Sequence, residues 1–305
     1  MALTFLVNGF FRSGTTFLFH ELREQFPNHA CYYEPCYPKL GLVVQNFKTK
    51  QGPDQLHQSS LWNEYAQLTP GEFQSLLRNH PNTDNAGIKN DAALFEYLKV
   101  FQNLESPAIL QTNRYHRYLD AIQTEYNIPV VHIIRNPIAV YHSLLKSYIQ
   151  RSSGLKKMIR SAIFPFTSKN YFGQETELRQ NIEKLGLPHV FYDNWKFRYF
   201  KKISFKEKVY INWILANYTV LVNNKSILIL FYENILSNPQ LESQRITEHL
   251  KMPFEIRKAK KPGEKSFNNR EYANFEKVVI KYKLNDMWQI LLKEMNAQNV
   301  NYFPS

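Results

Sequence analysis

A loop near the start of the chain has the glycine spacing and the side chains of an anion-binding turn. Residues 9–14 read G-x-x-x-x-G, and Ser13, Thr15 and Thr16 surround the second glycine. This is the phosphate-loop pattern, except that Thr15 stands where the pattern has lysine. Such a loop turns successive backbone N–H groups toward one point, and hydroxyls and the guanidinium of Arg12 can add charge-assisted contacts. Two interpretations stay open from the loop alone: a phosphate or sulfate site, and a tight strand-to-helix turn.

An arginine at the end of an apolar run is the second candidate for anion binding. Residues 129–134 are mostly β-branched, as in a buried parallel strand, and the Asn136-Pro137 pair is typical of a helix start. Arg135 is therefore expected at the carboxyl end of a strand, with Ser143 about two turns into the following helix. Together they could hold a second phosphate. The alternative is that Arg135 only pairs with a structural carboxylate.

Two further charged side chains are expected where short strands end. Glu34 follows the β-prone run 30–33 and precedes Pro35, which biases Glu34 toward an extended backbone at a strand end or in a loop. A carboxylate placed there could act as a general base, and the alternative is an ordinary surface glutamate. Lys89 is expected at the carboxyl end of a short strand over residues 85–91.

The composition is that of a globular protein with affinity for anions. The 305 residues carry a net charge of +12, yet they contain no nucleic-acid-binding motif and no long basic tail, so nucleic acid is not an expected partner. No apolar run is long enough to span a membrane, and the apolar start lacks the basic segment of a signal peptide. We expect a cytoplasmic protein in which Cys31 and Cys36 are reduced thiols, although their proximity also permits a disulfide.

Apolar runs alternate with helical patterns along the chain, which predicts an α/β fold with a doubly wound parallel sheet. Ligands are expected at the carboxyl ends of its strands. Besides the short runs described above, strands are expected at 3–7, 129–134 and 226–233, and helices at 92–101, 209–222 and about 239–250. We expect a single domain over residues 1–305, in which the weakly periodic segment 150–207 supplies a lid or an acceptor pocket.

Taken together, these segments resemble the sulfotransferases that use 3′-phosphoadenosine 5′-phosphosulfate (PAPS). Residues 11–18, FRSGTTFL, are similar to the 5′-phosphosulfate loop of that family. Arg135 followed by Ser143 is similar to its 3′-phosphate motif, and the two motifs occur in the family's order and at its usual separation. The resemblance implies a three-layer sandwich around a central parallel sheet, which is a P-loop NTPase-like sulfotransferase fold. It also implies PAPS as cosubstrate, PAP as product and no metal.

Weaker matches extend the resemblance over about residues 3–267. Glu34 matches a glutamate base of the carbohydrate-type and tyrosylprotein members. Lys89 matches a lysine that lies near the transferring sulfuryl group in the tyrosylprotein branch. The segment that begins at Tyr232 is similar to the family's Tyr-Glu-Asp/Asn-Leu segment, and residues 263–267 resemble its late cofactor-binding loop.

The chain departs from the aryl and steroid branch at two points. Arg12 stands where that branch has lysine, and no histidine occurs at the position of its base. The resemblance therefore implies Glu34 as the base, with Arg12, Thr16 and Lys89 around the transferring group. The residues implied for donor binding are Arg12, Ser13, Gly14, Thr15, Thr16, Phe17, Arg135, Ser143, Tyr232, Lys265 and Ser266.

The expected reaction is transfer of a sulfuryl group from PAPS to a hydroxyl or amine of a small-molecule acceptor, such as a secondary metabolite. A sugar or glycolipid acceptor is the alternative, and the oligomeric state stays open. The rival classes are a P-loop kinase or NTPase, a non-catalytic nucleotide sensor and a nucleic-acid binder. The first is disfavoured because Thr15 replaces the phosphate-binding lysine and no convincing strand carries an aspartate for Mg²⁺.

Overall fold

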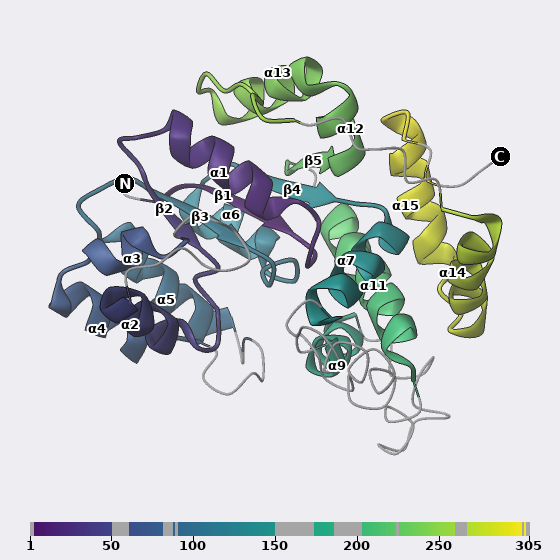
Figure 1. The fold of residues 1–305 in the computed structure, drawn as a ribbon, viewed down its shortest axis with the longest axis horizontal. Coiled ribbons are helices and arrows are strands. Elements are labelled where there is room, and N and C mark those ends of the chain that lie inside the picture. Colours follow the sequence, from purple (N-terminus) through teal and green to yellow (C-terminus); the bar gives the residue numbers. More distant parts are fainter. Residues whose placement is uncertain are drawn as a thin grey trace.

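The structure is a computed structural model of the chain. It describes residues 3–50, 61–81, 88, 91–149, 174–185, 203–223, 226–259, 267–300 and 302. A five-stranded sheet in the order β2-β3-β1-β4-β5 lies at its centre, and every neighbouring pair of strands is parallel (Figure 1). The strands are β1 (Leu3–Gly9), β2 (Ala30–Tyr33), β3 (Ala108–Thr112), β4 (Val130–Ile134) and β5 (Leu228–Phe231).

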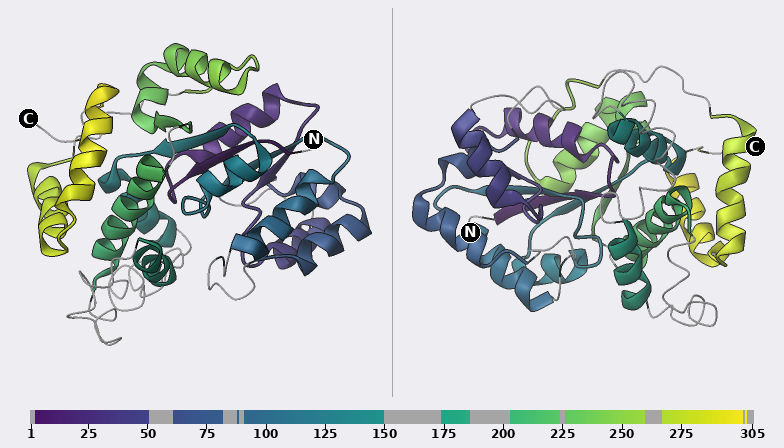
Figure 2. Two further views of the ribbon diagram at one scale, coloured as in Figure 1. Left: turned by 180° about the vertical axis from the view of Figure 1, so that it is seen from behind. Right: turned by 60° about the horizontal axis from the view of Figure 1, so that its bottom comes forward.

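Helices cover both faces of this sheet and complete a three-layer α/β sandwich (Figure 1). One face carries α1 (Thr15–Gln25), α12 (Tyr232–Ser237) and α13 (Pro239–Leu250), and the other carries α6 (Leu119–Tyr126), α7 (Pro137–Ile149) and α11 (Phe205–Asn223). The helices near the β2 edge are α2 (Leu40–Lys50), α3 (Asn63–Gln67), α4 (Pro70–Arg78) and α5 (Asp91–Gln102). Farther out lie α9 (Gln174–Lys184), α14 (Asn269–Lys281) and α15 (Asn285–Ala297), as the other two views also show (Figure 2).

The carboxyl ends of the five strands are level with one another. Asn8 pairs with both Thr112 and His132, so β1, β3 and β4 end together. The outer pairs, Tyr33 with Gln111 and Ile134 with Phe231, continue this alignment to both edges. Because all strands are parallel, the segments that leave them meet along one edge of the sheet, where doubly wound folds bind ligands.

A short chain of polar side chains runs through the otherwise apolar core. Asn8 donates from Nδ2 to Nδ1 of His132 at 2.9 Å, and Nε2 of His132 lies 2.9 Å from Oδ1 of Asn217. Oδ1 of Asn8 accepts from the backbone N–H of Tyr115. These partners fix a neutral His132 with its proton on Nε2, and complete burial lowers the pKa of this histidine to about 4. The network joins β1, β4 and α11 directly below the carboxyl edge.

Most predicted elements are present, and three expectations were wrong. The Asn136-Pro137 helix start is confirmed, since Oδ1 of Asn136 accepts from the N–H groups of residues 138 and 139, and α13 has the predicted bounds. The strand predicted over 226–233 ends at Phe231, and Tyr232 already begins α12. Strand β3 was missed altogether, and residues 85–87, 89 and 90 of the strand predicted around Lys89 lie outside the described residues.

The third error concerns the backbone of Glu34, which is left-handed at φ 44° rather than extended. The strand-end position itself is confirmed, because the N–H of Glu34 donates to the carbonyl of Gln111 at 2.8 Å and continues the β2–β3 ladder. The carbonyl of Glu34 then accepts from the N–H of Tyr37 at 2.8 Å. These two bonds close a tight turn, and the turn outweighs the local bias that proline imposes on the residue before it.

Candidate active site

The loop between β1 and α1 adopts a conformation in which its backbone curls around one point. Arg12 and Gly14 both have left-handed backbones, with φ of 65° and 101°. The N–H of Ser13 donates to the carbonyl of Phe10 at 3.1 Å, which closes the turn. Oγ of Ser13 is buried and has no hydrogen-bond partner among the described residues. A buried hydroxyl without a partner costs free energy. The hydroxyl of Ser13 is therefore suited to form a hydrogen bond with a bound group.

Gly14 is required by its neighbours as well as by its backbone. A Cβ atom added at Gly14 would lie 2.2 Å from Cδ2 of Tyr232, well inside van der Waals contact. The ring of Tyr232 also meets that of Phe17 edge-on, with centroids 6.5 Å apart. The first residue of α12 therefore packs directly on the loop. The rings of Phe17 and Tyr232 lie beside the end of the loop that leads into α1.

The two predicted anion motifs lie next to each other, although more than one hundred residues separate them in sequence. Nη1 of Arg135 donates to the carbonyl oxygen of Arg12 at 3.0 Å, and Nε of Arg12 donates to Oγ of Ser143 at 3.0 Å. The guanidinium of Arg135 lies 4.6 Å above the ring of Tyr232, and its Nε has no hydrogen-bond partner among the described residues. One guanidinium thus holds the loop while keeping a donor for an anion.

Glu34 lies on the other side of the loop, at the end of β2. The residue is 7% exposed, and its Oε1 accepts a hydrogen bond from Nδ2 of Asn113. Nε of Arg114 lies 3.9 Å from the second carboxylate oxygen. Burial raises the pKa of Glu34, while the charge of Arg114 and the hydrogen bond from Asn113 limit that rise. A carboxyl with a raised pKa and fixed partners is suited to accept a proton.

Asn113 and Arg114 are the two residues in contact with Glu34 that sequence reasoning missed. Asn113 links Glu34 to the loop, because its Oδ1 accepts from Oγ1 of Thr15 at 2.9 Å. Arg114 places its guanidinium 5.1 Å from the ring of Phe11, at the mouth of the loop. Both residues directly follow β3, so recognition of that strand would have brought them to the same edge as Glu34.

Most of these groups line one cavity of about 490 Å³, although Ser13 and Ser143 are not among its lining residues. Two sets of side chains line the cavity. The first is the loop and the groups around it, namely Phe11, Arg12, Gly14, Thr15, Thr16, Phe17, Arg135, Ser147 and Tyr232. The second, which we call the aromatic end, comprises Glu34, Asn113 and Arg114 with His20, Tyr33, Tyr37, Leu61 and Trp62. The two sets are in contact where Oγ1 of Thr16 lies 3.1 Å from the hydroxyl of Tyr33.

Three predicted site residues, Lys89, Lys265 and Ser266, lie outside the described residues. Within the described ranges, no cluster of histidine, cysteine, aspartate or glutamate could hold a metal ion, and no helix is long and apolar enough to cross a membrane. Cys31 and Cys36 are buried thiols that form no disulfide, and burial raises the pKa of each to about 12.

Comparison with known proteins identifies the family. The family model described as "Sulfotransferase domain" matches residues 4–289, which is most of the chain. The chain belongs to the sulfotransferase family. An uncharacterised protein of Archaeoglobus fulgidus is 26% identical over 279 residues, which cover 85% of this sulfotransferase and 87% of the relative.

Two solved structures resemble this sulfotransferase more distantly. A sulfotransferase from Alicyclobacillus acidocaldarius is 11% identical, with a TM-score of 0.41 over 93% of this chain and 95% of its own. Mouse sulfotransferase SULT7A1, crystallised with PAP, is also 11% identical, with a TM-score of 0.39 over 93% of this chain and 66% of its own. The parallel five-stranded sheet with helices on both faces is the fold expected of this family.

Proposed function

We propose that this sulfotransferase moves the sulfuryl group of PAPS to a hydroxyl or amine of a small-molecule acceptor and releases PAP. The observation that carries the proposal is the shared cavity. It brings Arg12 and the loop, Arg135 and the buried carboxylate of Glu34 together. A donor that carries one sulfated and one free phosphate end needs two anion sites, and an acceptor hydroxyl needs a base.

Several features of the loop suit such a donor. Ser13 has a buried hydroxyl with no partner among the described residues, and Gly14 leaves no room for a side chain beside Tyr232. We assign the phosphosulfate end to the loop, to Arg12 and to the hydroxyls of Thr15 and Thr16. The 3′-phosphate is assigned to Arg135, whose Nε also lacks a described partner, together with Ser143. Phe17 and Tyr232 would flank the adenine. Lys265 and Ser266 remain proposed donor ligands, and Lys89 a proposed neighbour of the sulfuryl group.

In the proposed reaction, Glu34 receives a proton from the acceptor. The acceptor oxygen or nitrogen forms a bond to sulfur while the bond from sulfur to the bridging phosphate oxygen breaks, so the electron pair leaves with PAP. Arg12, Thr16 and the loop N–H groups stabilise charge on the sulfuryl and bridging oxygens. Arg114 is a further cation at this end of the cavity and limits the rise in the pKa of Glu34.

The acceptor would bind at the aromatic end of the cavity, beside Glu34. The ring of Trp62 meets that of Tyr33 at 5.5 Å and that of Tyr37 at 5.8 Å, which makes a rigid wall. Leu61 adds an aliphatic contact to the same end. Such a wall favours a flat or apolar acceptor over a fully hydrated one. We therefore favour a compact organic alcohol, phenol or amine as the acceptor over a sugar or glycolipid.

Two measurements test this function. Calorimetry with PAP, ATP and a short oligonucleotide should show a preference for PAP, because only the bisphosphate engages both the loop and Arg135. Incubation with labelled PAPS and a panel of phenols, aliphatic alcohols, amines and sugars should then transfer label to at least one class. Tighter binding of ATP than of PAP, or label lost only to water across the panel, would contradict the proposal.

A further inference from the structure

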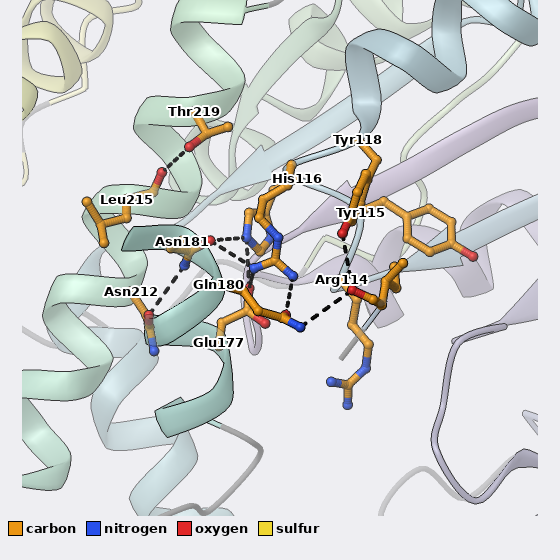
Figure 3. Close-up of polar contacts among 12 residues, drawn as sticks. Arg114, Tyr115, His116, Tyr118, Glu177, Gln180, Asn181, Asn212, Leu215 and Thr219 are labelled. Carbon is orange, nitrogen blue, oxygen red and sulfur yellow. Dashed lines mark hydrogen bonds and ion pairs between the residues drawn. The ribbon is translucent and has the colours of Figure 1, made fainter. Parts of the chain in front are cut away.

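A buried polar cluster joins α9 to the segment 113–117 that follows β3 (Figure 3). The carboxylate of Glu177 accepts from Nε2 of His116 at 2.8 Å and from Nη1 of Arg117 at 3.1 Å. Oδ1 of Asn181, one turn further along α9, accepts from the same two groups at 3.0 Å each. The carboxylate of Glu177 and the amide of Asn181 therefore bind the segment 113–117 to α9.

Two further contacts fix the cluster in place. Nη2 of Arg117 donates to Oε1 of Gln180 at 2.6 Å, and Nδ2 of Asn181 donates to Oδ1 of Asn212 on α11 at 3.3 Å. The cluster is buried, since Glu177 is 4% exposed and His116 is 1% exposed. Burial opposes ionisation of Glu177, but the charges of Arg117 and His116 outweigh it and hold the pKa of that carboxyl at about 2. Loss of the Glu177 charge would leave Arg117 buried with no ionised partner in the cluster, which is costly.

The segment held by this cluster also carries the two residues that contact the proposed base. Asn113 hydrogen-bonds Glu34, and Arg114 forms the ion pair with it. In Figure 3 the guanidinium of Arg114 points away from the contacts of Glu177. Its charge nevertheless lowers the pKa of both carboxyls, so it lies within electrostatic reach of each. The charge of Arg114 thus favours the ionised form of both buried carboxyls.

We propose that Glu177 is a positioning residue, which holds segment 113–117 so that Asn113 and Arg114 present Glu34 to the acceptor. The proposal rests on the proposed function, in which Glu34 is the base. The groups that face Glu177 are His116 and Arg117 at hydrogen-bond distance, with Arg114 and Tyr118 within electrostatic range. This contact couples α9, which lies within the segment 150–207 predicted to supply a lid or an acceptor pocket, to the proposed base.

The test is Glu177→Gln, measured by steady-state kinetics with PAPS and an acceptor found in the panel above. We expect kcat to fall about tenfold to a hundredfold, as when the support of a catalytic group is removed, with KM for PAPS and Kd for PAP unchanged. The acid limb of the kcat profile should also move to higher pH. Asn113 and Arg114 both lower the pKa of Glu34, and they would hold its carboxylate less closely once the segment is released.

A matched control is Glu242→Gln on α13. Glu242 is as buried as Glu177 and accepts from Nη1 of Arg245 at 2.7 Å, but it lies on the other face of the sheet, away from the cavity. This variant also removes a buried carboxylate from an arginine pair, and it should leave the pH profile in place. Gln180→Ala is a milder probe, because it removes one contact to Arg117 and leaves every charge; it should lower kcat in the same direction by a smaller factor.

Hydrogen exchange gives a readout that does not depend on turnover. Amides of residues 111–118 should lose protection in Glu177→Gln and keep it in Glu242→Gln. Unchanged kcat and pH profile in both Glu177→Gln and Gln180→Ala, with an active wild type, would overturn the positioning role alone. If Glu177→Gln does not fold, an unchanged kcat in Gln180→Ala overturns it. A wild type that transfers no sulfuryl group from PAPS would overturn the proposed function, and the positioning role with it.

Discussion

The guanidinium of Arg135 donates to the carbonyl oxygen of Arg12 across 3.0 Å, and this bond joins the ends of β4 and β1. It explains how two motifs distant in sequence can serve one ligand. Arg135 does not merely stand near the loop; it also fixes the carbonyl at which the loop has a left-handed backbone. Its remaining donors would face the ligand, so loss of this side chain should affect both the loop and the anion.

Arg135→Ala should weaken PAP binding. Loss of a hydrogen bond to a charged group costs about 1.5–3 kcal/mol, which corresponds to a tenfold to hundredfold rise in Kd. Calorimetric titration with PAP measures the change. Arg257→Ala is the control, since Arg257 is an arginine whose side chain is 58% exposed and does not line the cavity. An equal loss of PAP affinity in both variants would show that PAP binding depends only on the overall charge of the protein.

Gly14→Ala should disrupt the loop for two separable reasons. A left-handed backbone costs a non-glycine residue about 1–2 kcal/mol, and the new Cβ would lie 2.2 Å from the ring of Tyr232. The double variant Gly14→Ala with Tyr232→Ala removes the clash and keeps the backbone strain. In thermal unfolding, the double variant should therefore lose less stability than the two single variants lose in sum. It should still be less stable than the wild type. Gly71→Ala, where a Cβ would meet nothing within 4 Å, should leave stability nearly unchanged. A similar loss there would argue against a local cause.

Glu34→Gln should keep PAP affinity and lower kcat by about two to four decades, because the amide cannot accept the proton. The pH profile of kcat in the wild type should show the ionisation of Glu34. Burial raises the pKa of Glu34 above 4.5, the carboxylate is the active form, and kcat should therefore rise with pH through that raised pKa and then level off. The variant should lack this limb. Near-normal turnover in Glu34→Gln would remove the residue from the role of base.

The free energy of unfolding should fall as the pH drops from 6.5 toward 4, in part because of His132. The folded state holds this histidine neutral with a pKa of about 4, whereas the unfolded chain takes up a proton near 6.5. The unfolded state thus binds more protons in this window, which is worth about 3 kcal/mol across it. Urea unfolding at several pH values should give a smaller slope for His132→Gln, in which the amide can still donate to Asn217. Equal slopes for the two proteins would count against a buried neutral histidine.

The sequence predicted the part of the candidate site around the loop and Arg135 better than the part around Glu34. The loop at 9–14 and the strand before Arg135 have strong local patterns, because phosphate loops need glycine at fixed positions and buried parallel strands need β-branched runs. Their meeting through Arg135 and Arg12 follows from the parallel sheet, which brings the ends of separate strands to one edge.

The part of the site around Glu34 depends on β3, and this strand has no clear pattern. The run Ala108–Thr112 is only five residues long and ends in glutamine and threonine, so neither alternation nor a long apolar stretch marks it. Without β3, Asn113 and Arg114 could not be connected with Glu34. The left-handed backbone of Glu34 was equally hidden, since it depends on the ladder bond to Gln111 as well as on the local turn bond from Tyr37.

Both native cysteines are covered and carry thiols with a pKa of about 12. Thiol reagents act on the thiolate, so maleimides and iodoacetamides should leave the folded enzyme unlabelled at neutral pH. The wild-type chain is thus a ready background for spectroscopy. A single cysteine introduced at Ile280, which is 66% exposed on α14, would carry one fluorophore or spin label with no native thiol to remove first.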